Sequence, residues 1–333
     1  MTDHVGNVAF IGLGAMGYAM AKNIRQKMAP TGTLYVFDVF RGACERFQDE
    51  FKDFGPIVIV DSPKEAASMS QTIISIVPGA SEVRDVYMNE VMGIIAIPKN
   101  VDRLIMECST IDSQSSREVG EALKNAGVGT YIDTPVSGGV PGADAGTLSF
   151  LMGHTKPSDT DPVSHRLETV AAMMGDPKKF FYCGKLGAGL AAKISNNYLS
   201  CSILLAVAEA MAIGIRSGVD EKLLHEVIQN STGQNFMADK VQPVPGVVPD
   251  APSSHNYRLG FKTQMMIKDL GLGVDAGYAT GIKPTMAEAA YRVYEKAAVD
   301  PKCIVSEAPS PVGDRDGSSV YLHITATPEE DQK

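Results

Sequence analysis

The sequence predicts an α/β fold in its N-terminal part and an all-helical C-terminal part, joined by one long helix. Through residues 1–184, short apolar runs alternate with stretches of helical periodicity. This alternation is typical of a parallel, doubly wound sheet with helices on both faces. After residue 217 we find almost only helical periodicity. We therefore expect two domains, 1–184 and 185–333, with 188–217 as an interdomain helix.

The individual elements follow from apolar runs, helical periods and the glycines and prolines that interrupt them. We expect strands at 8–11, 34–37, 57–60, 72–77, 104–106, 130–132, 148–152 and 180–182. We expect N-terminal helices at 15–27, 42–54, 63–69, 81–91, 113–125 and 162–174, and C-terminal ones at 220–230, 261–278 and 284–298. The segment 301–319 is rich in Pro, Gly, Ser and Asp, which predicts an exposed loop, and we expect disorder over 325–333.

Composition restricts the classes of partner. The 333 residues carry a net charge of -9, which argues against nucleic acid and anionic membranes as partners. The longest nearly unbroken apolar run, 201–208, is far shorter than the roughly 20 residues of a membrane span. The five cysteines are widely spaced and odd in number, as expected of reduced thiols.

The N-terminus bears on the compartment. The first expected strand begins at Val8, which leaves no room for a signal peptide or presequence ahead of it. We therefore expect a cytoplasmic protein, or one of the mitochondrial matrix if the chain is a trimmed form.

A glycine-rich motif follows the first expected strand and opens the first helix. It reads Gly12-Leu13-Gly14-Ala15-Met16-Gly17. In a G-x-G-x-x-G loop the first glycine allows the tight turn, the second lets a pyrophosphate approach the backbone, and the third lets helix and strand pack. The motif predicts a dinucleotide-binding site.

An acidic residue ends the second expected strand at the spacing that this motif needs. Asp38 comes 21 residues after Gly17 (38 − 17), close to the spacing of about 20 at which an acid binds the adenosine ribose. Its charge would repel a 2′-phosphate, so NAD is the expected cofactor. Arg41, three residues later, leaves NADP as the less favoured alternative.

Two polar segments follow later strands of the expected sheet. After Ile132 comes Asp133-Thr134-Pro135-Val136-Ser137-Gly138-Gly139, whose serine and paired glycines suit an oxyanion but equally suit a turn. Thr110 precedes the helix expected near Ser113 and is either part of its N-terminal cap or a cofactor contact, the cap being the safer interpretation by residue type.

The long helix carries a lysine in an unusual setting. Lys193 and Asn197 are four residues apart and share one helix face. Most helix lysines are solvated, but the neighbours Ala191, Ala192 and Ile194 favour a buried or cleft position. Desolvation there lowers a lysine pKa and favours proton exchange near neutral pH. Lys193 is thus a candidate acid/base.

Other charged residues give weaker signals. Lys268 and Asp269 lie within an apolar helix, where a salt-bridged surface pair is the simpler interpretation. The six histidines share no metal-binding spacing, so we expect no metal site.

Taken together, five blocks resemble the β-hydroxyacid dehydrogenase family. They are FIGLGAMG (10–17), STID (109–112), DTPVSGG (133–139), GAGLAAKISNN (187–197) and GFKTQMMIKDLGL (260–272). The resemblance covers about residues 8–298. It implies a Rossmann-like N-terminal domain, a long interdomain helix, an all-helical C-terminal domain and a homodimer or homotetramer.

The resemblance also assigns residue roles. It implies that Lys193 is the catalytic acid/base and that Asn197 orients it or the substrate hydroxyl. Ser137, Gly138 and Gly139 would hold the substrate carboxylate. The cofactor contacts that it adds to the glycine-rich loop and Asp38 are Val77, Pro78, Thr110 and Lys268.

The implied activity is oxidation of a small 3-hydroxy acid by NAD. Within the family, the PVPGV loop (243–247) and residues 256–261 favour 3-hydroxyisobutyrate as substrate. Sister reductases of tartronate, succinate or glyoxylate semialdehyde are the nearest alternative, and a non-catalytic dinucleotide-binding adaptor is a more distant one. Two stretches, 26–32 and 301–319, are longer than the resemblance implies, and neither touches the matched blocks.

Overall fold

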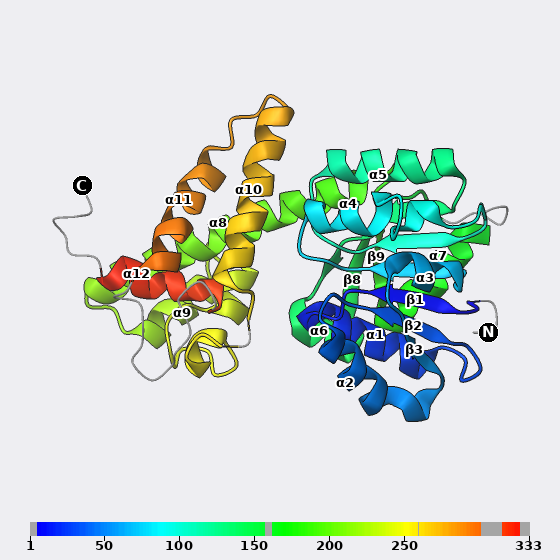
Figure 1. Ribbon diagram of the computed structural model, residues 1–333. Helices are drawn as coiled ribbons and strands as arrows, with labels where there is room; N and C mark the ends of the chain where they lie inside the picture. Colours follow the sequence, from blue (N-terminus) through cyan, green and yellow to red (C-terminus); the bar gives the residue numbers. More distant parts are fainter. Residues whose placement is uncertain (1–4, 157–161, 259, 301–314, 327–333) are drawn as a thin grey trace. The chain divides into compact units, whose positions relative to one another are not determined.

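A computed structural model describes residues 5–156, 162–258, 260–300 and 315–326 (Figure 1). The chain divides into two compact units, residues 1–193 and 194–333. The division falls inside helix α8 (Ala188–Arg216), the long helix expected at 188–217. The domain boundary predicted after residue 184 lies just ahead of this helix.

The first unit is built on a six-stranded sheet whose strands are all parallel. In spatial order these are β3 (Ile57–Ile59), β2 (Leu34–Phe37), β1 (Val8–Ile11), β4 (Thr72–Ser75), β5 (Leu104–Glu107) and β6 (Thr130–Asp133). The strand order reverses between β1 and β4, which creates the crevice where doubly wound sheets bind ligands. The predicted Rossmann-like fold is confirmed.

Side-chain alternation along the strands builds a core on each face of the sheet. On β1, Val8 and Phe10 belong to one buried cluster, and Ala9 and Ile11 belong to the other. The first cluster contains residues of α1 (Ala15–Lys27), α2 (Arg41–Phe51) and α7 (Pro162–Met174), and the second those of α3 (Pro63–Ser68), α4 (Ala80–Met88) and α5 (Ser113–Ala126). Both faces are thereby covered (Figure 1).

A second, smaller sheet departs from the sequence prediction. Strands β7 (Val136–Ser137), β8 (Leu148–Met152) and β9 (Gly175–Tyr182) form it, with β7 antiparallel and β9 parallel to β8. We expected 148–152 and 180–182 as part of one parallel sheet. Apolar periodicity identifies a strand but not its partner, and here the short helix α6 (Gly139–Ala145) separates β7 from β8.

The second unit is helical, as predicted. It contains the rest of α8 with α9 (Glu221–Gln229), α10 (Thr263–Ala279), α11 (Thr285–Val299) and α12 (Val320–Ala326). Among its described residues this unit also contains a π-helical segment, η3 (Met237–Val241), and two short 3-10 helices, η4 (Pro252–His255) and η7 (Gly317–Ser319). Cys201, Leu205 and Ala208 of α8 pack into one core with Leu270 of α10 and Tyr294 of α11.

Part of the C-terminal segment is packed against the second unit, where its composition suggested an exposed loop. Of the exposed loop expected at 301–319, residues 301–314 lie outside the described residues, but 315–319 are buried. Asp316 accepts hydrogen bonds from Phe261 N (2.7 Å) and Ser318 N (2.9 Å), which fixes this stretch against the start of α10. Thr325 and Ala326 end helix α12, so the expectation of disorder was wrong for these two residues; the rest of that stretch, 327–333, lies outside the described residues.

Helix α8 is long and apolar enough to cross a membrane, judged by length and composition alone. Its most apolar 18-residue window has a mean hydropathy of 1.9, and 39% of that window is buried within the protein. A core helix of a soluble protein passes the same test. The apolar run 201–208 found in the sequence covers only part of this helix, because Ser200 and Glu209 end the run although α8 continues beyond both of them.

Candidate active site

Most of the predicted cofactor residues follow strands that end side by side at one edge of the sheet. Phe37, Ile11, Ser75, Glu107 and Asp133 are neighbours in one row of strand register, across five parallel strands. Each is the last residue of its strand. The loops that follow carry the glycine motif and most of the other predicted contacts, so these loops all begin at the carboxyl edge of the sheet.

The glycine-rich loop has the geometry that a pyrophosphate needs. Gly12 has φ of 95°, and a Cβ there would lie 2.1 Å from Ile76 O. A Cβ on Gly17 would lie 2.0 Å from Gly12 O, so the first turn of α1 packs directly on the loop. A Cβ on Gly14 would meet no described atom within 4 Å. The space above Gly14 forms a cradle at the N-terminus of α1, which suits phosphate oxygens.

Asp38 lies against this loop. Its carboxylate accepts hydrogen bonds from Leu13 N (2.6 Å) and from Phe40 N (2.7 Å). A hollow of about 400 Å³ adjoins the loop and is lined by Leu13, Gly14, Ala15, Tyr18, Phe40, Gly42, Ala43 and Arg46. The guanidinium of Arg46 stands 4.4 Å from the centre of the Tyr18 ring. The residues present therefore fit a dinucleotide, with the hollow on the side of its adenosine.

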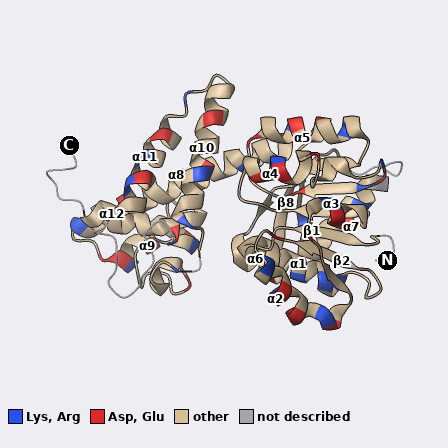
Figure 2. Ribbon diagram, in the orientation of Figure 1, with Lys and Arg blue, Asp and Glu red and all other residues tan. Residues whose placement is uncertain are grey.

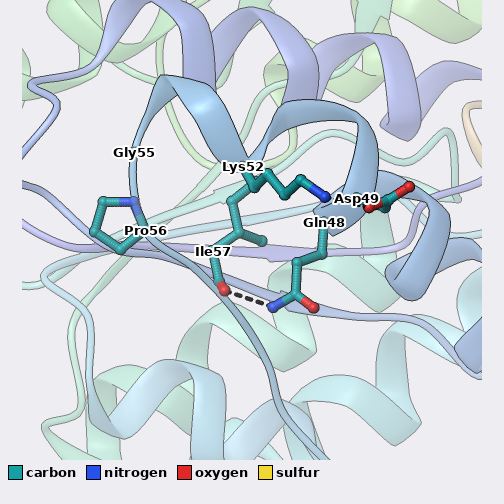
Figure 3. A pocket seen from close by; sticks show the side chains of 6 residues that line it. All are labelled: Gln48, Asp49, Lys52, Gly55, Pro56 and Ile57. Atoms are coloured by element: carbon teal, nitrogen blue, oxygen red, sulfur yellow. Dashed lines mark hydrogen bonds and ion pairs between the residues drawn. The ribbon is translucent and has the colours of Figure 1, made fainter.

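A larger hollow lies elsewhere. It has a volume of about 550 Å³ and is lined by Gln48, Asp49, Lys52, Gly55, Pro56 and Ile57 (Figure 3). Gln48 Nε2 donates to Ile57 O (2.7 Å) across it. Ile57 begins strand β3, so this hollow opens at the amino end of the strands, away from the glycine-rich loop. We do not assign the cofactor to it.

A buried carboxyl supports the loops that carry Val77, Pro78 and Thr110. Glu107 accepts a hydrogen bond from Ser109 N (2.6 Å) and one from the Ser75 hydroxyl. Ser109 Oγ in turn accepts from Val77 N (2.7 Å) and so connects the two loops. Burial raises the pKa of Glu107 to about 6, although the hydrogen bonds from Ser109 and Ser75 oppose the rise.

Sequence reasoning missed Glu107 and Ser109. The available signal was the charged residue at the end of the otherwise apolar strand LIME, at the carboxyl edge of the sheet. Thr110 does not cap the next helix: that cap is Asp112, whose carboxylate accepts from Ser115 N (2.7 Å).

The Ser137 to Gly139 turn has a backbone that favours glycine. Gly138 and Gly139 have φ of 137° and 62°, values that L residues rarely adopt. Gly138 is the N-cap of α6, and both glycines are exposed. Backbone amides in such a turn can bind an oxyanion.

Lys193 is buried, as its alanine-rich surroundings predicted. Only 8% of the residue is exposed, and its neighbours on α8, Leu190 and Ile194, are buried too. Asp133 accepts hydrogen bonds from Gly187 N and Leu190 N at the start of α8. Burial raises the pKa of Asp133 to about 6, and these backbone hydrogen bonds oppose the rise.

The second unit contributes its own polar cluster. Asn197 Nδ2 donates to Asp269 Oδ2 (2.6 Å), and Asn197 Oδ1 accepts from Asn196 (3.2 Å). Lys268 Nζ lies 3.3 Å from Asp269 Oδ1. The salt bridge that was the simpler interpretation of 268–269 is present, but it is not a surface pair, since the Asp269 side chain is only 4% exposed and that of Lys268 30%. The predicted residues therefore divide, with Asn197 and Lys268 in the second unit and the others in the first.

Among the described residues, no group of three or more His, Cys, Asp or Glu side chains is placed to hold a metal ion. The described cysteines are free thiols: Cys44, Cys108, Cys183 and Cys201.

Known families match both parts of the chain. Residues 7–184 match the family model described as the NAD binding domain of 6-phosphogluconate dehydrogenase. Residues 187–302 match the model described as NAD-binding of NADP-dependent 3-hydroxyisobutyrate dehydrogenase.

Individual relatives agree with these matches. Mitochondrial 3-hydroxyisobutyrate dehydrogenase of Mus musculus is 38% identical over 289 residues, covering 86% of this chain and 80% of the mouse protein. NAD-dependent L-serine dehydrogenase of Pseudomonas aeruginosa is 34% identical over 287 residues, which cover 86% of this chain and 90% of the Pseudomonas protein. The solved Mycobacterium tuberculosis 3-hydroxyisobutyrate dehydrogenase with L-serine is 31% identical, has a TM-score of 0.81, and covers 97% of this chain and 100% of that one.

Proposed function

This chain belongs to the β-hydroxyacid dehydrogenase family, and on that premise we propose that it oxidises 3-hydroxyisobutyrate to methylmalonate semialdehyde with NAD, as in valine catabolism. It is an oxidoreductase acting on small hydroxy acids. The observation that carries the proposal is buried Lys193, on a helix whose first turn is hydrogen-bonded to the carboxyl edge of the sheet that bears the glycine-rich loop.

Lys193 is the proposed general acid/base. As a neutral amine it takes the proton from the substrate hydroxyl. In the reverse direction, as an ammonium ion, it polarises the aldehyde oxygen and returns the proton. Asn197, four residues later on α8, faces the same side of the helix and orients Lys193 or the substrate hydroxyl.

The Ser137 hydroxyl and the backbone amides of Gly138 and Gly139 are the proposed holders of the substrate carboxylate. The positive φ of both glycines supports this, since it presents successive amides without side chains. Holding the carboxylate fixes the reacting carbon, so part of the rate comes from orientation.

The proposed cofactor contacts are Gly12 to Gly17 and Asp38, with Val77, Pro78 and Thr110 on the nicotinamide side. The resemblance adds Lys268, which pairs with Asp269, as a contact of the cofactor or the substrate. When bound, the nicotinamide supplies the hydride acceptor. The carboxylate of Asp38, held against Leu13 N, supports NAD over NADP, because it would repel a 2′-phosphate.

L-serine is a second candidate substrate. The dehydrogenase of Pseudomonas aeruginosa acts on it, and the solved mycobacterial relative contains it. L-serine is also a 3-hydroxy acid, so the proposed carboxylate and hydroxyl contacts serve it equally. The two substrates differ at the carbon that bears a methyl or an ammonium group. Tartronate, succinate and glyoxylate semialdehydes, tested in the reductive direction, complete the set of alternatives.

One assay separates these alternatives. The purified protein is given each acid with NAD or NADP, and reduced nicotinamide is followed by absorbance. We expect the highest kcat/KM with 3-hydroxyisobutyrate and NAD. A higher value with L-serine would replace the substrate assignment, and a preference for NADP would contradict the interpretation of Asp38.

The role of Lys193 has its own test. Lys193→Ala should lower kcat at least about a hundredfold, the low end of a general acid/base contribution, while NADH still binds. Kinetics and NADH fluorescence measure the two effects. Lys185→Ala, on an exposed lysine before α8, is the matched control and should leave turnover unchanged. Turnover retained in Lys193→Ala would contradict the mechanism.

A further inference from the structure

A buried side chain of the sheet is hydrogen-bonded to the first turn of helix α8. Asp133, the last residue of β6, is completely buried, and its two carboxylate oxygens accept from Gly187 N (2.7 Å) and Leu190 N (2.9 Å). The first amides of a helix have no partner within the helix, so an acceptor that takes two of them fixes the position of that end. No described hydrogen bond of Asp133 goes to another side chain.

The surrounding backbone leaves little room for another arrangement. A Cβ on Gly189 would lie 2.2 Å from Leu151 O and 2.9 Å from Asp133 Oδ2, and a Cβ on Gly153 would lie 1.8 Å from Asp133 Oδ1. Helix, strand β8 and carboxylate thus meet where only glycine fits. Ser113 Oγ also donates to Gly187 O (3.0 Å), from the start of α5.

We propose that Asp133 is a positioning residue for Lys193, setting where the amine lies by fixing the first turn of α8. Lys193 follows Leu190 by three residues, less than one helical turn, so a shift of the first turn is carried to the lysine by the helix backbone. This inference rests on the proposed role of Lys193 as acid/base. Asp133 itself needs no contact with substrate or cofactor.

The geometry explains why an aspartate is needed. A serine offers one oxygen on a shorter side chain and cannot accept from two amides three residues apart. A glutamate is one methylene longer, and the close approach of Gly153 and Gly189 leaves no space for it. An asparagine keeps one acceptor oxygen and should hold the turn only in part.

The test compares Asp133→Asn and Asp133→Ala with wild type at a temperature well below the melting of each. We expect kcat to fall roughly tenfold for the first and up to about a hundredfold for the second, because small misplacements of reacting groups are costly. KM for NAD and the affinity for NADH should stay within about twofold, because the glycine-rich loop is unchanged. If Asp133→Ala fails to fold, the kinetics of Asp133→Asn alone decide whether Asp133 positions Lys193.

A control and a second measurement separate positioning from general stability. Asp220 caps α9 by accepting from Lys222 N and Leu223 N (both 3.0 Å), so Asp220→Asn removes the same kind of cap from a helix without a proposed catalytic residue. It should leave kcat unchanged. Amide hydrogen exchange should quicken at 187–193 in the Asp133 variants and not in Asp220→Asn.

The outcomes distinguish this inference from the proposed function. If Lys193→Ala is inactive but Asp133→Asn keeps wild-type kcat, positioning by Asp133 is wrong and the role of Lys193 stands. The positioning role of Asp133 would also be overturned if KM for NAD rose by as large a factor as kcat fell in the Asp133 variants. Unchanged amide exchange at 187–193 in these variants would overturn it too. If Lys193→Ala keeps its turnover, the proposed mechanism fails and the inference fails with it.

Discussion

Glu107 shows how one buried residue can organise two loops. It is fully buried at the carboxyl end of β5, and through Ser109 it holds the backbone of Val77. Tyr87 shares the same pocket, since its hydroxyl lies 2.5 Å from Ser75 Oγ, and burial raises the pKa of Tyr87 well above its usual value. A carboxyl in this setting makes the stability of the protein depend on pH.

The direction of that dependence follows from the raised pKa. Folded Glu107 keeps its proton up to about pH 6, whereas the unfolded residue releases it near 4.5. Between these values the folded state binds more protons, so the free energy of unfolding falls as pH rises. Relative to Glu107→Gln, wild type should lose about 2 kcal/mol of stability between about pH 4 and pH 7.

Urea denaturation of both proteins across this pH range measures the effect. Glu90→Gln, at an exposed position, is the matched control and should follow wild type. A difference between wild type and Glu107→Gln that stays constant with pH would show that Glu107 does not titrate in this window.

At the scale of elements, the start of helix α2 bears on the choice of cofactor. Arg41, its first residue, pairs with Asp61 (2.7 Å) and more loosely with Glu45 (3.5 Å). Helix α2 carries both arginines and acidic residues (Figure 2). In the sequence, Arg41 was the cation that left NADP as an alternative. Its two acidic partners reduce its attraction for a 2′-phosphate.

Removing the nearer acid should therefore favour NADP. All three side chains of this cluster are at least 60% exposed, and exposed ion pairs are worth only about 0.2–1 kcal/mol. Asp61→Asn should raise kcat/KM for NADP by up to about fivefold and leave the value for NAD unchanged. The control is Asp49→Asn, whose partner is Lys52. An unchanged ratio of the two cofactors would show that Asp61 has no part in the preference.

The bounds of helix α8 and the burial of Lys193 on it were both predicted from the sequence. Its period predicted 188–217, and the structure has 188–216. The sequence also predicted that Lys193 is buried. What it did not reveal is the acceptor at the helix start, Asp133, which lies more than 50 positions earlier in the chain.

At the scale of the whole molecule, we propose a homodimer or homotetramer. Large apolar side chains are exposed on the second unit, more than half of each being accessible: Leu199, Ile213, Leu223, Val227 and Phe236. These side chains lie on α8, on α9 and in the segment after α9, and contiguous exposed apolar surface marks contacts between protein chains. A second copy of the chain covering α8 and α9 would also account for the apolar, partly exposed character of α8.

Light scattering on the purified protein tests the assembly. We expect the mass of a dimer or tetramer, and Ile213→Asp should shift it toward the monomer because it places a charge in the apolar surface. Val91→Asp, equally exposed but on the first unit, is the control and should leave the mass unchanged. A monomeric wild type, or an assembly insensitive to Ile213→Asp, would contradict the proposal.

The sequence by itself determined most of the elements and the cofactor loop of this protein. Strand and helix periods, and the spacing of Gly12, Gly14 and Gly17 ahead of Asp38, are local properties that a chain shows before it folds. They predicted the doubly wound sheet, the helical second part and the long helix, and the structure has all three.

Only the tertiary structure decided which distant groups meet. The contacts of Glu107 with Ser75 and of Asp133 with Gly187 join residues 32 and 54 positions apart. The separate sheet of β7, β8 and β9 and the burial of 315–319 are likewise set by packing partners. No local period encodes such pairings, because they depend on which buried polar group finds an acceptor once the chain has closed around it.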